Sequence, residues 1–335
     1  MTLNNYYKEY KYIPIELLIF FSELKALENG KHTGHTVQEF CDYYKGKYNK
    51  VEAPQPQIVA MICDKLVKDN SLTVLNRGGF MDMENSYYCL LNDRSSLSDQ
   101  LILDLRNVQL SSAIYGFEFI YDHYKRYVIP ILNIDNKGDQ SIGSAFIYRG
   151  GIVTAKHCIE GANKIAVKGI SEKDLKSAIF YISPKKGMDL IYIKLPSDIT
   201  DSIYFKNEVN ILEEVMALGY PKIPGFHNFL TAEKATVSAR YTATRGAVVS
   251  IAEDIWIRED LILITAKIQA GNSGGPIIND KGMVVGVGVN IPTGKGKYDD
   301  LGYGTVIPIS FADNIIDSLD SEFDTSSIEF LNFID

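Results

Sequence analysis

Two patterns of apolar residues divide the chain. In the first third, apolar side chains recur at every third or fourth position, which is the spacing of one helix face. This spacing predicts three helices, over residues 13–29, 36–44 and 57–69. Thr36 is a suitable N-cap for the second helix, with Glu39 at the capping-box position. Two runs typical of strands follow, at 72–75 and 87–91, and glycines lie between them.

From residue 127 onward the pattern changes to short apolar runs that are separated by turn residues. These runs predict strands at 128–134, 142–148, 151–155, 164–167, 178–182, 190–195, 215–218, 234–239, 261–266, 276–278 and 284–289. Many short strands at this spacing indicate an antiparallel barrel or sandwich. Between the two regions, residues 93–124 predict a helical connector, although Gly116 and the aromatic residues after it weaken the helical pattern. Residues 310–319 predict a last helix, and the acidic tail beyond carries apolar residues that we expect to pack.

Three helices followed by a hairpin is the layout of a winged helix, and residues 1–92 resemble that fold by pattern alone. Winged helices often place their third helix in the major groove of DNA. A DNA-binding domain is expected to present a basic face, but residues 1–92 carry ten basic against eleven acidic residues. We therefore favour contact with a protein, or autoregulation, over binding of nucleic acid, which stays a possible but disfavoured alternative.

The composition is that of a soluble globular protein, with 46% hydrophobic and 23% charged residues among 335. The net charge of −8, without a long basic run, argues against broad affinity for nucleic acid. The first residues lack the charged and apolar regions of a secretory signal. The apolar stretch at 13–21 is too short to span a bilayer, so no membrane association is expected.

One stretch has the composition of a catalytic loop. Residues 271–276, Gly-Asn-Ser-Gly-Gly-Pro, place a single serine among three glycines. Glycine permits backbone conformations that other residues avoid, so two N–H groups can point into one small space beside the hydroxyl. An acyl-transfer enzyme needs such a nucleophile next to donors for an oxyanion. We therefore predict Ser273 as nucleophile and the N–H groups of Gly271 and Ser273 as the oxyanion hole.

A serine hydroxyl also needs a base and a group that orients the base. Of the five histidines, only His157 lies in a context that suggests chemistry, Ile-Val-Thr-Ala-Lys-His-Cys at 152–158. Asp189 stands at the head of the apolar run that follows it. The chain order is therefore histidine, aspartate, serine, and we predict His157 as general base and Asp189 as its orienting acid.

These three motifs resemble those of the trypsin-like serine peptidases, in the order of that family. Asn272, which precedes the serine where digestive trypsins carry aspartate, makes the sequence more similar to the HtrA-type branch. The segments 215–221, 235–239 and 304–308 are also similar to that branch. The resemblance covers about residues 125–320. It implies two six-stranded barrels with the active site between them, His157 and Asp189 coming from the first barrel and Ser273 from the second.

The resemblance also implies a substrate pocket and a cellular setting. Lys267, Val289, Asn290 and Ile291 would line the pocket for the side chain before the cleaved bond. Lys267 stands where trypsins that select Lys or Arg carry aspartate, so we expect small or aliphatic side chains instead. The cysteines show no metal-ligand spacing, and we expect no metal or other cofactor. Cys158 has no upstream disulfide partner at the family's position, which predicts a buried free thiol and a cytoplasmic location.

Together these inferences predict a multidomain α+β protein. A winged-helix-like domain occupies residues 1–92, a helical connector 93–124, and an all-β, double-barrel trypsin-like peptidase domain 125–335. The predicted function is an intracellular serine endopeptidase that cleaves a protein substrate, without N-terminal processing, under control of its N-terminal domain and possible protein partners. The alternative is a winged-helix DNA-binding regulator whose peptidase-like domain only binds partners.

Overall fold

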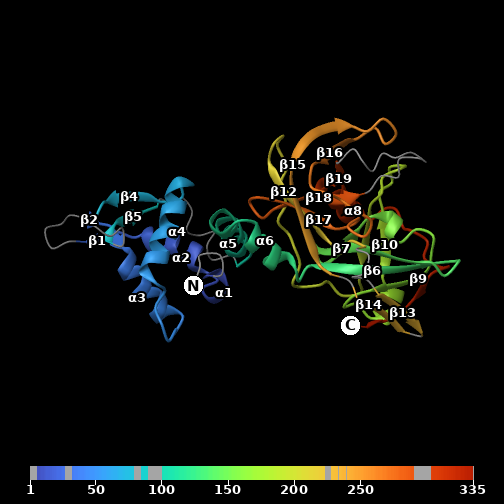
Figure 1. The fold of residues 1–335 in the computed structure, drawn as a ribbon, viewed down its shortest axis with the longest axis horizontal. Coiled ribbons are helices and arrows are strands. Elements are labelled where there is room, and N and C mark those ends of the chain that lie inside the picture. Colours follow the sequence, from blue (N-terminus) through green and yellow to red (C-terminus); the bar gives the residue numbers. More distant parts are fainter. Residues whose placement is uncertain are drawn as a thin grey trace. The chain divides into compact units, whose positions relative to one another are not determined.

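The structure of the protein is a computed structural model, which describes residues 6–26, 32–78, 84–89, 100–222, 228–232, 234–238, 240–289 and 303–334 (Figure 1). The chain forms two compact units, Met1–Ile120 and Tyr121–Asp335. The boundary falls inside helix α6 (Phe117–Tyr124), a few residues before the predicted start of the second domain at 125. The two units are described separately below.

The first unit is mostly helical. Its helices are α1 (Tyr6–Glu9), α2 (Ile13–Phe21), α3 (Val37–Lys47), α4 (Pro56–Lys68) and α5 (Gln100–Tyr115). A small sheet joins β3 (His35–Thr36), β5 (Ser86–Tyr88) and β4 (Thr73–Asn76), and β1 (Lys25–Ala26) pairs with β2 (His32–Thr33). Large aromatic side chains fill the core between α2, α3 and β5, notably Phe21, Phe40 and Tyr87, which are fully buried.

The three helices that the sequence predicts in this unit are present, with different ends. The capping box at the start of α3 is confirmed, because the Thr36 side chain accepts from the Glu39 N–H and the Glu39 carboxylate accepts from the Thr36 N–H. The first helix, predicted to reach residue 29, ends at Phe21. There the Ser22 hydroxyl donates to the Ile19 carbonyl at 2.6 Å, and extended backbone begins at Lys25.

The predicted connector contains two helices instead of one. Helix α5 ends at Tyr115 and α6 begins at Phe117. Gly116 between them has φ of +69°, a left-handed conformation that ends one helix before the next can start. The residues from 90 to 99, which the prediction included, lie outside the described residues.

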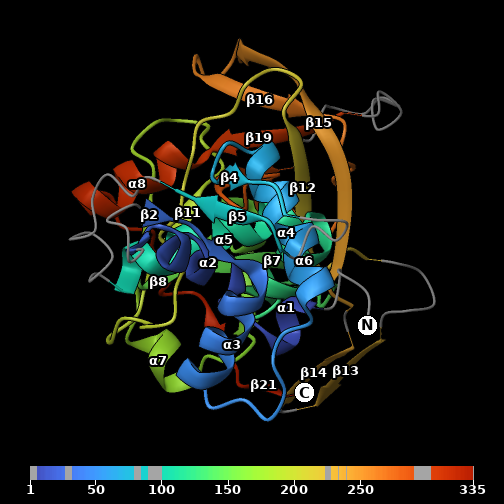
Figure 2. The same cartoon turned by 90° about the vertical axis from the view of Figure 1, so that its left-hand side faces the viewer.

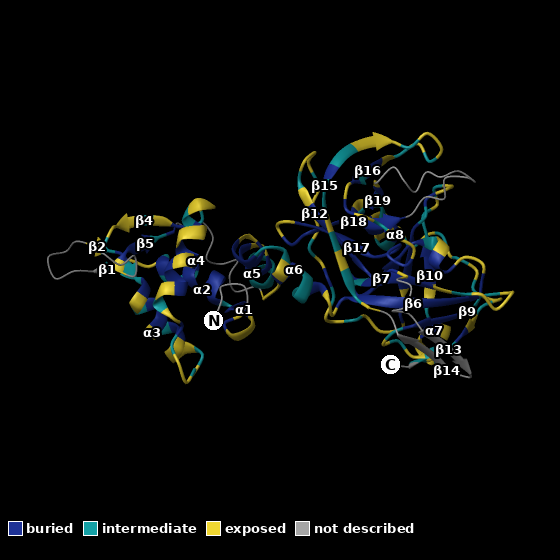
Figure 3. Cartoon of the chain, in the orientation of Figure 1, coloured by how far each residue is buried: buried dark blue, intermediate teal, exposed yellow. Residues whose placement is uncertain are grey.

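In the second unit, strands form two large sheets. Within the described residues the first sheet has seven strands, ordered β10 (Ile179–Ile182), β11 (Ile191–Lys194), β8 (Gly151–Thr154), β7 (Gln140–Tyr148), β6 (Val128–Asp135), β9 (Ala162–Val167) and β20 (Glu329–Phe330). Strands β6 and β7 are buried along most of their length (Figure 3). The prediction of six strands is therefore wrong for this sheet, because the C-terminal tail adds β20 in parallel to β9.

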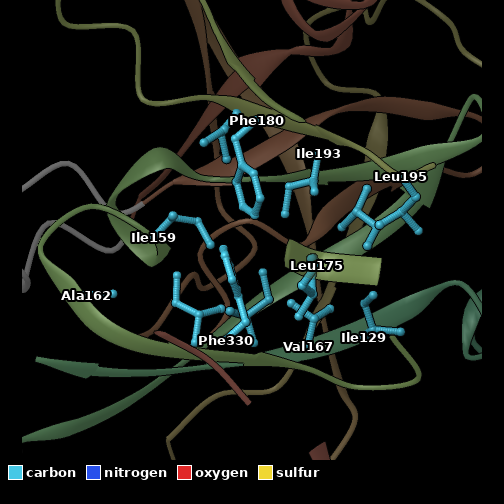
Figure 4. Packing of buried hydrophobic residues seen from close by; sticks show 14 residues of the cluster. Ile129, Ile159, Ala162, Val167, Leu175, Phe180, Ile193, Leu195 and Phe330 are labelled. Atoms are coloured by element: carbon cyan, nitrogen blue, oxygen red, sulfur yellow. The ribbon is translucent and has the colours of Figure 1, made fainter. Parts of the chain in front are cut away.

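The tail also fills the core of this sheet. Phe330 on β20 is 5% exposed and stacks on Phe180, with ring centroids 5.7 Å apart. Leu175 from the short helix α7 (Glu172–Lys176) packs into the same core (Figure 4). The expectation that the acidic tail packs is confirmed, and its apolar residues complete the first sheet.

The second sheet is a closed barrel of six strands in the part of the chain described, as predicted. Its order is β12 (Glu214–Gly219), β15 (Thr242–Glu253), β16 (Asp260–Ile264), β19 (Gly304–Pro308), β18 (Val284–Val289) and β17 (Pro276–Asn279). Beside these sheets, β13 (Asn228–Ala232), β14 (Lys234–Ser238) and β21 (Phe333–Ile334) pair in a smaller one (Figure 2).

Helix α8 (Ile309–Ser318) follows the barrel, close to the predicted helix at 310–319. Its Asp313 is 4% exposed and accepts from the Tyr148 hydroxyl at 3.0 Å, Arg149 at 2.9 Å and Lys206 at 2.6 Å. A buried carboxylate needs such partners. Tyr148 and Arg149 attach the helix to the first sheet, and Lys206 comes from a segment that bridges to Val284 of the barrel. Over the described residues, no helix combines the length and apolar character needed to cross a membrane.

Candidate active site

His157 lies in a 3-10 turn, η4 (Lys156–Cys158), directly after strand β8. The turn is closed by the Cys158 N–H, which donates to the Ala155 carbonyl at 3.0 Å. The buried Asn133 side chain donates to the Cys158 carbonyl at 3.1 Å. The turn therefore holds His157 just beyond the C-terminal end of β8, with 41% of its side chain exposed.

Asp189 lies two residues before β11, the neighbour of β8 in the sheet. Its Oδ2 is 2.5 Å from Nδ1 of His157, and its Oδ1 accepts the backbone N–H of His157 at 2.8 Å. A carboxylate held in this way fixes the orientation of the imidazole and the tautomer that carries the proton on Nδ1. The structure thus brings the predicted base and its orienting acid together.

The pKa of His157 depends on this contact. Burial by itself lowers the pKa of the imidazole, but hydrogen bonds to Asp189 and Cys158, together with the charge of Asp189, outweigh it. The net result raises the pKa of His157 from 6.5 to about 10. The carboxylate therefore stabilises the imidazolium, which is the form that a general base reaches after it accepts a proton.

The loop of Ser273 precedes β17 and depends on glycines. Gly271 and Gly274 have φ of +95° and +84°, in the left-handed region that other residues rarely adopt. A Cβ on Gly274 would lie 2.1 Å from the Ser144 carbonyl oxygen, and one on Gly271 would lie 2.4 Å from that of Tyr220. Only glycine fits at these positions, because both the space and the conformation exclude a side chain.

Backbone hydrogen bonds determine where the N–H groups of this loop point. The Ala270 carbonyl accepts from the Lys222 N–H at 2.8 Å, and the Asn272 carbonyl accepts from the Gly275 N–H at 3.0 Å. In a trans peptide the N–H points opposite to the carbonyl, so the N–H groups of Gly271 and Ser273 point away from these partners. Neither N–H donates a hydrogen bond to any residue that the structure describes.

Ser273 itself is 3% exposed and is connected to the first sheet. Its carbonyl accepts from the Ser144 N–H at 2.9 Å and lies 3.5 Å from Sγ of Cys158, the neighbour of His157. The nucleophile loop therefore adjoins the histidine turn. Within the described residues the Ser273 hydroxyl has no hydrogen-bond partner, so the complete triad stays a prediction.

The predicted pocket residues are not brought together by any contact in the described part of the chain. Lys267 is exposed, and its carbonyl accepts from the Thr244 hydroxyl at 2.7 Å. Val289 ends strand β18 and is 1% exposed. Asn290 and Ile291 lie outside the described residues, so the pocket also stays a prediction.

Two residues at this site were not predicted to contribute to it. Ser144 on β7 contacts the loop from the first sheet, and Tyr220 follows β12 and donates to the Ser144 hydroxyl. Their sequence signals are weak. A serine within an apolar strand is common, and so is a tyrosine directly after an apolar strand. Among the described residues, no group of three His, Cys, Asp or Glu side chains could hold a metal ion.

Comparison with known proteins agrees with this geometry. Residues 143–287 match the family model described as the trypsin-like peptidase domain. A DegP-like periplasmic serine endoprotease of Chlamydia trachomatis is 32% identical over 184 residues, which are 54% of this chain and 34% of that protein. A protein of the same name from Hahella chejuensis is 28% identical over 74% of this chain and 51% of its own length. The chain spans about a third to a half of these relatives.

Solved structures with similar chains include the active form of the Rv3671c protease from M. tuberculosis. That similarity has 20% identity and a TM-score of 0.47, over 62% of this chain and 87% of the other. The HtrA-type protease AlgW with a tripeptide follows, with 21% identity and a TM-score of 0.44 over 60% of this chain and 62% of the other.

The comparison overturns one prediction. The curated relatives are named periplasmic, so the prediction of a cytoplasmic location is wrong. Cys158 is indeed buried and free. A buried thiol is chemically inert in either compartment, however, and its state gives no information about location. Residues 143–287 thus match a trypsin-like peptidase domain, and about half of the chain is similar to the DegP-like serine endoproteases.

Proposed function

We propose that the protein is a serine endopeptidase. Ser273 attacks the carbonyl carbon of a peptide bond, and His157 accepts the hydroxyl proton and then gives it to the leaving amine. Water hydrolyses the resulting acyl-enzyme with His157 again as base. Asp189 orients the imidazole and stabilises its protonated form. The bond between His157 and Asp189 at 2.5 Å is the observation that carries this proposal.

The oxyanion hole is the second part of the mechanism. The N–H groups of Gly271 and Ser273 donate to the oxygen that becomes negative in the tetrahedral intermediate. Each such donor contributes about 3–4 kcal/mol to transition-state stabilisation. The carbonyls of these two peptides accept from Lys222 and Gly275, so the two N–H groups point in the opposite direction, which supports this role.

The substrate we propose is a protein. The relatives are named as endoproteases, which cleave within polypeptide chains. Residues 143–287 match the trypsin-like peptidase domain, which supports peptide-bond hydrolysis as the reaction. We also propose that Lys267, with Val289, Asn290 and Ile291, limits the pocket to small or aliphatic side chains.

For the first unit we propose a winged-helix-like domain that regulates the peptidase through protein contact. Helices α2, α3 and α4, with the sheet β3–β5–β4, support this assignment. The charges on α4 speak against binding of DNA. Lys65 donates to the Ile114 carbonyl, and its pKa is lowered by burial, so this cation is directed into its own unit. An electrophoretic shift of DNA that weakens with salt would instead favour a DNA-binding regulator.

The experiment for the proposed function is proteolysis of an unfolded protein such as reduced casein. The full chain should release peptides, and Ser273→Ala should not, because the nucleophile is lost. Comparison with a fragment of residues 117–335 tests regulation, since a faster or slower fragment supports control by the first unit. Equal rates for the full chain and the fragment would reject control by the first unit. Casein that stays intact with the full chain and with the fragment would reject the proposed endopeptidase activity.

A further inference from the structure

Ser144 is a fully buried residue of strand β7 that contacts the nucleophile loop through two of its groups. Its hydroxyl donates to the Gly271 carbonyl at 2.6 Å. Its backbone N–H donates to the Ser273 carbonyl at 2.9 Å. Ser144 therefore contacts both residues whose N–H groups form the proposed oxyanion hole, although it lies on the opposite sheet.

The remaining groups of Ser144 are also paired. Its hydroxyl accepts from the Tyr220 N–H at 2.8 Å, and its carbonyl accepts from the Thr154 hydroxyl at 2.7 Å. A Cβ on Gly219 would lie 2.6 Å from Oγ of Ser144, so the hydroxyl is tightly enclosed. Because the Tyr220 N–H occupies the hydroxyl oxygen as a donor, the Ser144 hydroxyl proton is directed at the Gly271 carbonyl oxygen.

This contact bears on the direction of the Gly271 N–H. The Gly271 carbonyl and N–H belong to the two peptide planes that flank its Cα. The peptide between Gly271 and Asn272 is held at its carbonyl by the Ser144 hydroxyl and at its N–H by the Gln269 carbonyl, at 2.8 Å. The peptide between Ala270 and Gly271 is held at its carbonyl by the Lys222 N–H. A glycine with φ of +95° has other conformations available, so the loss of the Ser144 hydroxyl removes one of the hydrogen bonds that restrain Gly271.

We propose that Ser144 is a positioning residue for the oxyanion hole. Its hydroxyl keeps the Gly271 N–H directed at the developing oxyanion, and its N–H keeps Ser273 in the same loop conformation. It acts through Gly271 and touches no reacting atom. This inference rests on the proposed endopeptidase function.

The test compares Ser144→Ala with Tyr148→Phe, which removes another buried, hydrogen-bonded hydroxyl from the same strand. Hydrolysis of a fluorogenic peptide with alanine before the cleaved bond gives kcat and KM. Ser144→Ala should lower kcat by about 10–100-fold with little change in KM, because the donor is misplaced only for the transition state. Affinity for a peptide boronic acid, which forms a tetrahedral adduct with the serine, should fall by a similar factor.

Equal kcat and boronate affinity in Ser144→Ala and Tyr148→Phe would overturn the inference. Ser144→Cys keeps a weaker donor at the position and should give an intermediate kcat. If Ser144→Ala does not fold, kcat and boronate affinity of Ser144→Cys are compared with those of Tyr148→Phe instead.

A crystal structure of a Ser144 variant decides the question without turnover. We expect the peptide between Gly271 and Asn272, whose carbonyl Ser144 binds, to be reoriented in it and the Gly271 N–H to be displaced with it. An unchanged loop overturns the inference. A reoriented loop in a chain whose wild type cleaves no peptide rejects the proposed function, while the positioning of Gly271 by Ser144 stands.

Discussion

Nδ1 of His157 lies 2.5 Å from Oδ2 of Asp189, and the other oxygen of the same carboxylate accepts the His157 N–H at 2.8 Å. One carboxylate therefore holds both the ring and the backbone of the histidine. The ring cannot rotate without the loss of the first contact, and the turn cannot shift without the loss of the second.

The first prediction concerns the dependence of activity on pH. His157 must be neutral to accept the Ser273 proton, and its pKa is raised to about 10. kcat/KM should therefore rise as the pH increases toward about 10, instead of reaching its plateau near neutrality. In Asp189→Asn the pKa should fall toward 6.5, so the rise should move to lower pH, while the maximal kcat drops by about 10⁴-fold.

The same raised pKa affects stability with a defined sign. The contact with Asp189 favours protonated His157 in the folded chain, so its contribution is full below pH 6.5 and is lost as the pH rises through about 10. Urea unfolding of wild type and His157→Gln at pH 6 and pH 10 measures this. A difference between the two proteins that is larger at pH 10 would contradict the assignment.

The second prediction concerns the glycines of the nucleophile loop. Gly274 and Gly138 have nearly the same φ, +84° and +85°, but a Cβ on Gly138 would meet no atom within 4 Å. Gly138→Ala should cost about 1–2 kcal/mol of folding free energy, from the left-handed conformation alone. Gly274→Ala should cost more than about 3 kcal/mol, because steric overlap is added to that strain. Equal midpoints of urea unfolding for the two variants would contradict this account.

The third prediction concerns the attachment of α8. Removal of the buried Asp313 carboxylate takes away the acceptor of Tyr148 and Lys206 and one of the two acid partners of Arg149. Asp313→Ala should therefore lower the unfolding free energy by about 2–3 kcal/mol, because hydrogen bonds to a charged group are lost and the buried Tyr148 hydroxyl is left without its acceptor. Asp317→Ala is the control, because Asp317 is 64% exposed and its pair with Arg149 contributes about 1 kcal/mol or less. A similar decrease in unfolding free energy in the two variants would mean that the buried carboxylate stabilises the fold no more than the exposed one.

The fourth prediction concerns the C-terminal strand. Phe330 fills the core of the first sheet, so Phe330→Ala should destabilise the fold by about 3–5 kcal/mol. Glu329→Ala, one residue earlier, removes only a surface pair with Lys164 and should change stability by about 1 kcal/mol at most. A thermal melt in which both variants match wild type would show that the tail does not support the sheet.

The sequence predicts the features whose signals are local. The capping box of Thr36 and Glu39, the short strands and the three motifs around His157, Asp189 and Ser273 each depend on residues that are close in the chain. The motif residues also indicated a pairing of His157 with Asp189, which the structure contains. Long-range pairing of this kind was inferred from chemistry and from family resemblance, and not from periodicity.

Features that depend on distant partners could not be predicted. Strand β20 is two residues long, too short for an alternating pattern, and its partner Ile165 lies far away in sequence. The role of Ser144 follows from its approach to Gly271, 127 residues later, which no local pattern encodes. The prediction of a cytoplasmic location was wrong for another reason. A buried thiol such as Cys158 is equally stable in the cytoplasm and in the periplasm, so it does not indicate the compartment.

The central claim is that Ser273 is a nucleophile activated by His157, and labelling by a fluorophosphonate probe tests it most directly. We predict that the full chain is labelled, that Ser273→Ala is not labelled, and that His157→Gln is labelled far more slowly although it folds. Equal labelling of the wild type and Ser273→Ala, or no labelling of a wild-type chain that is folded, would contradict the account.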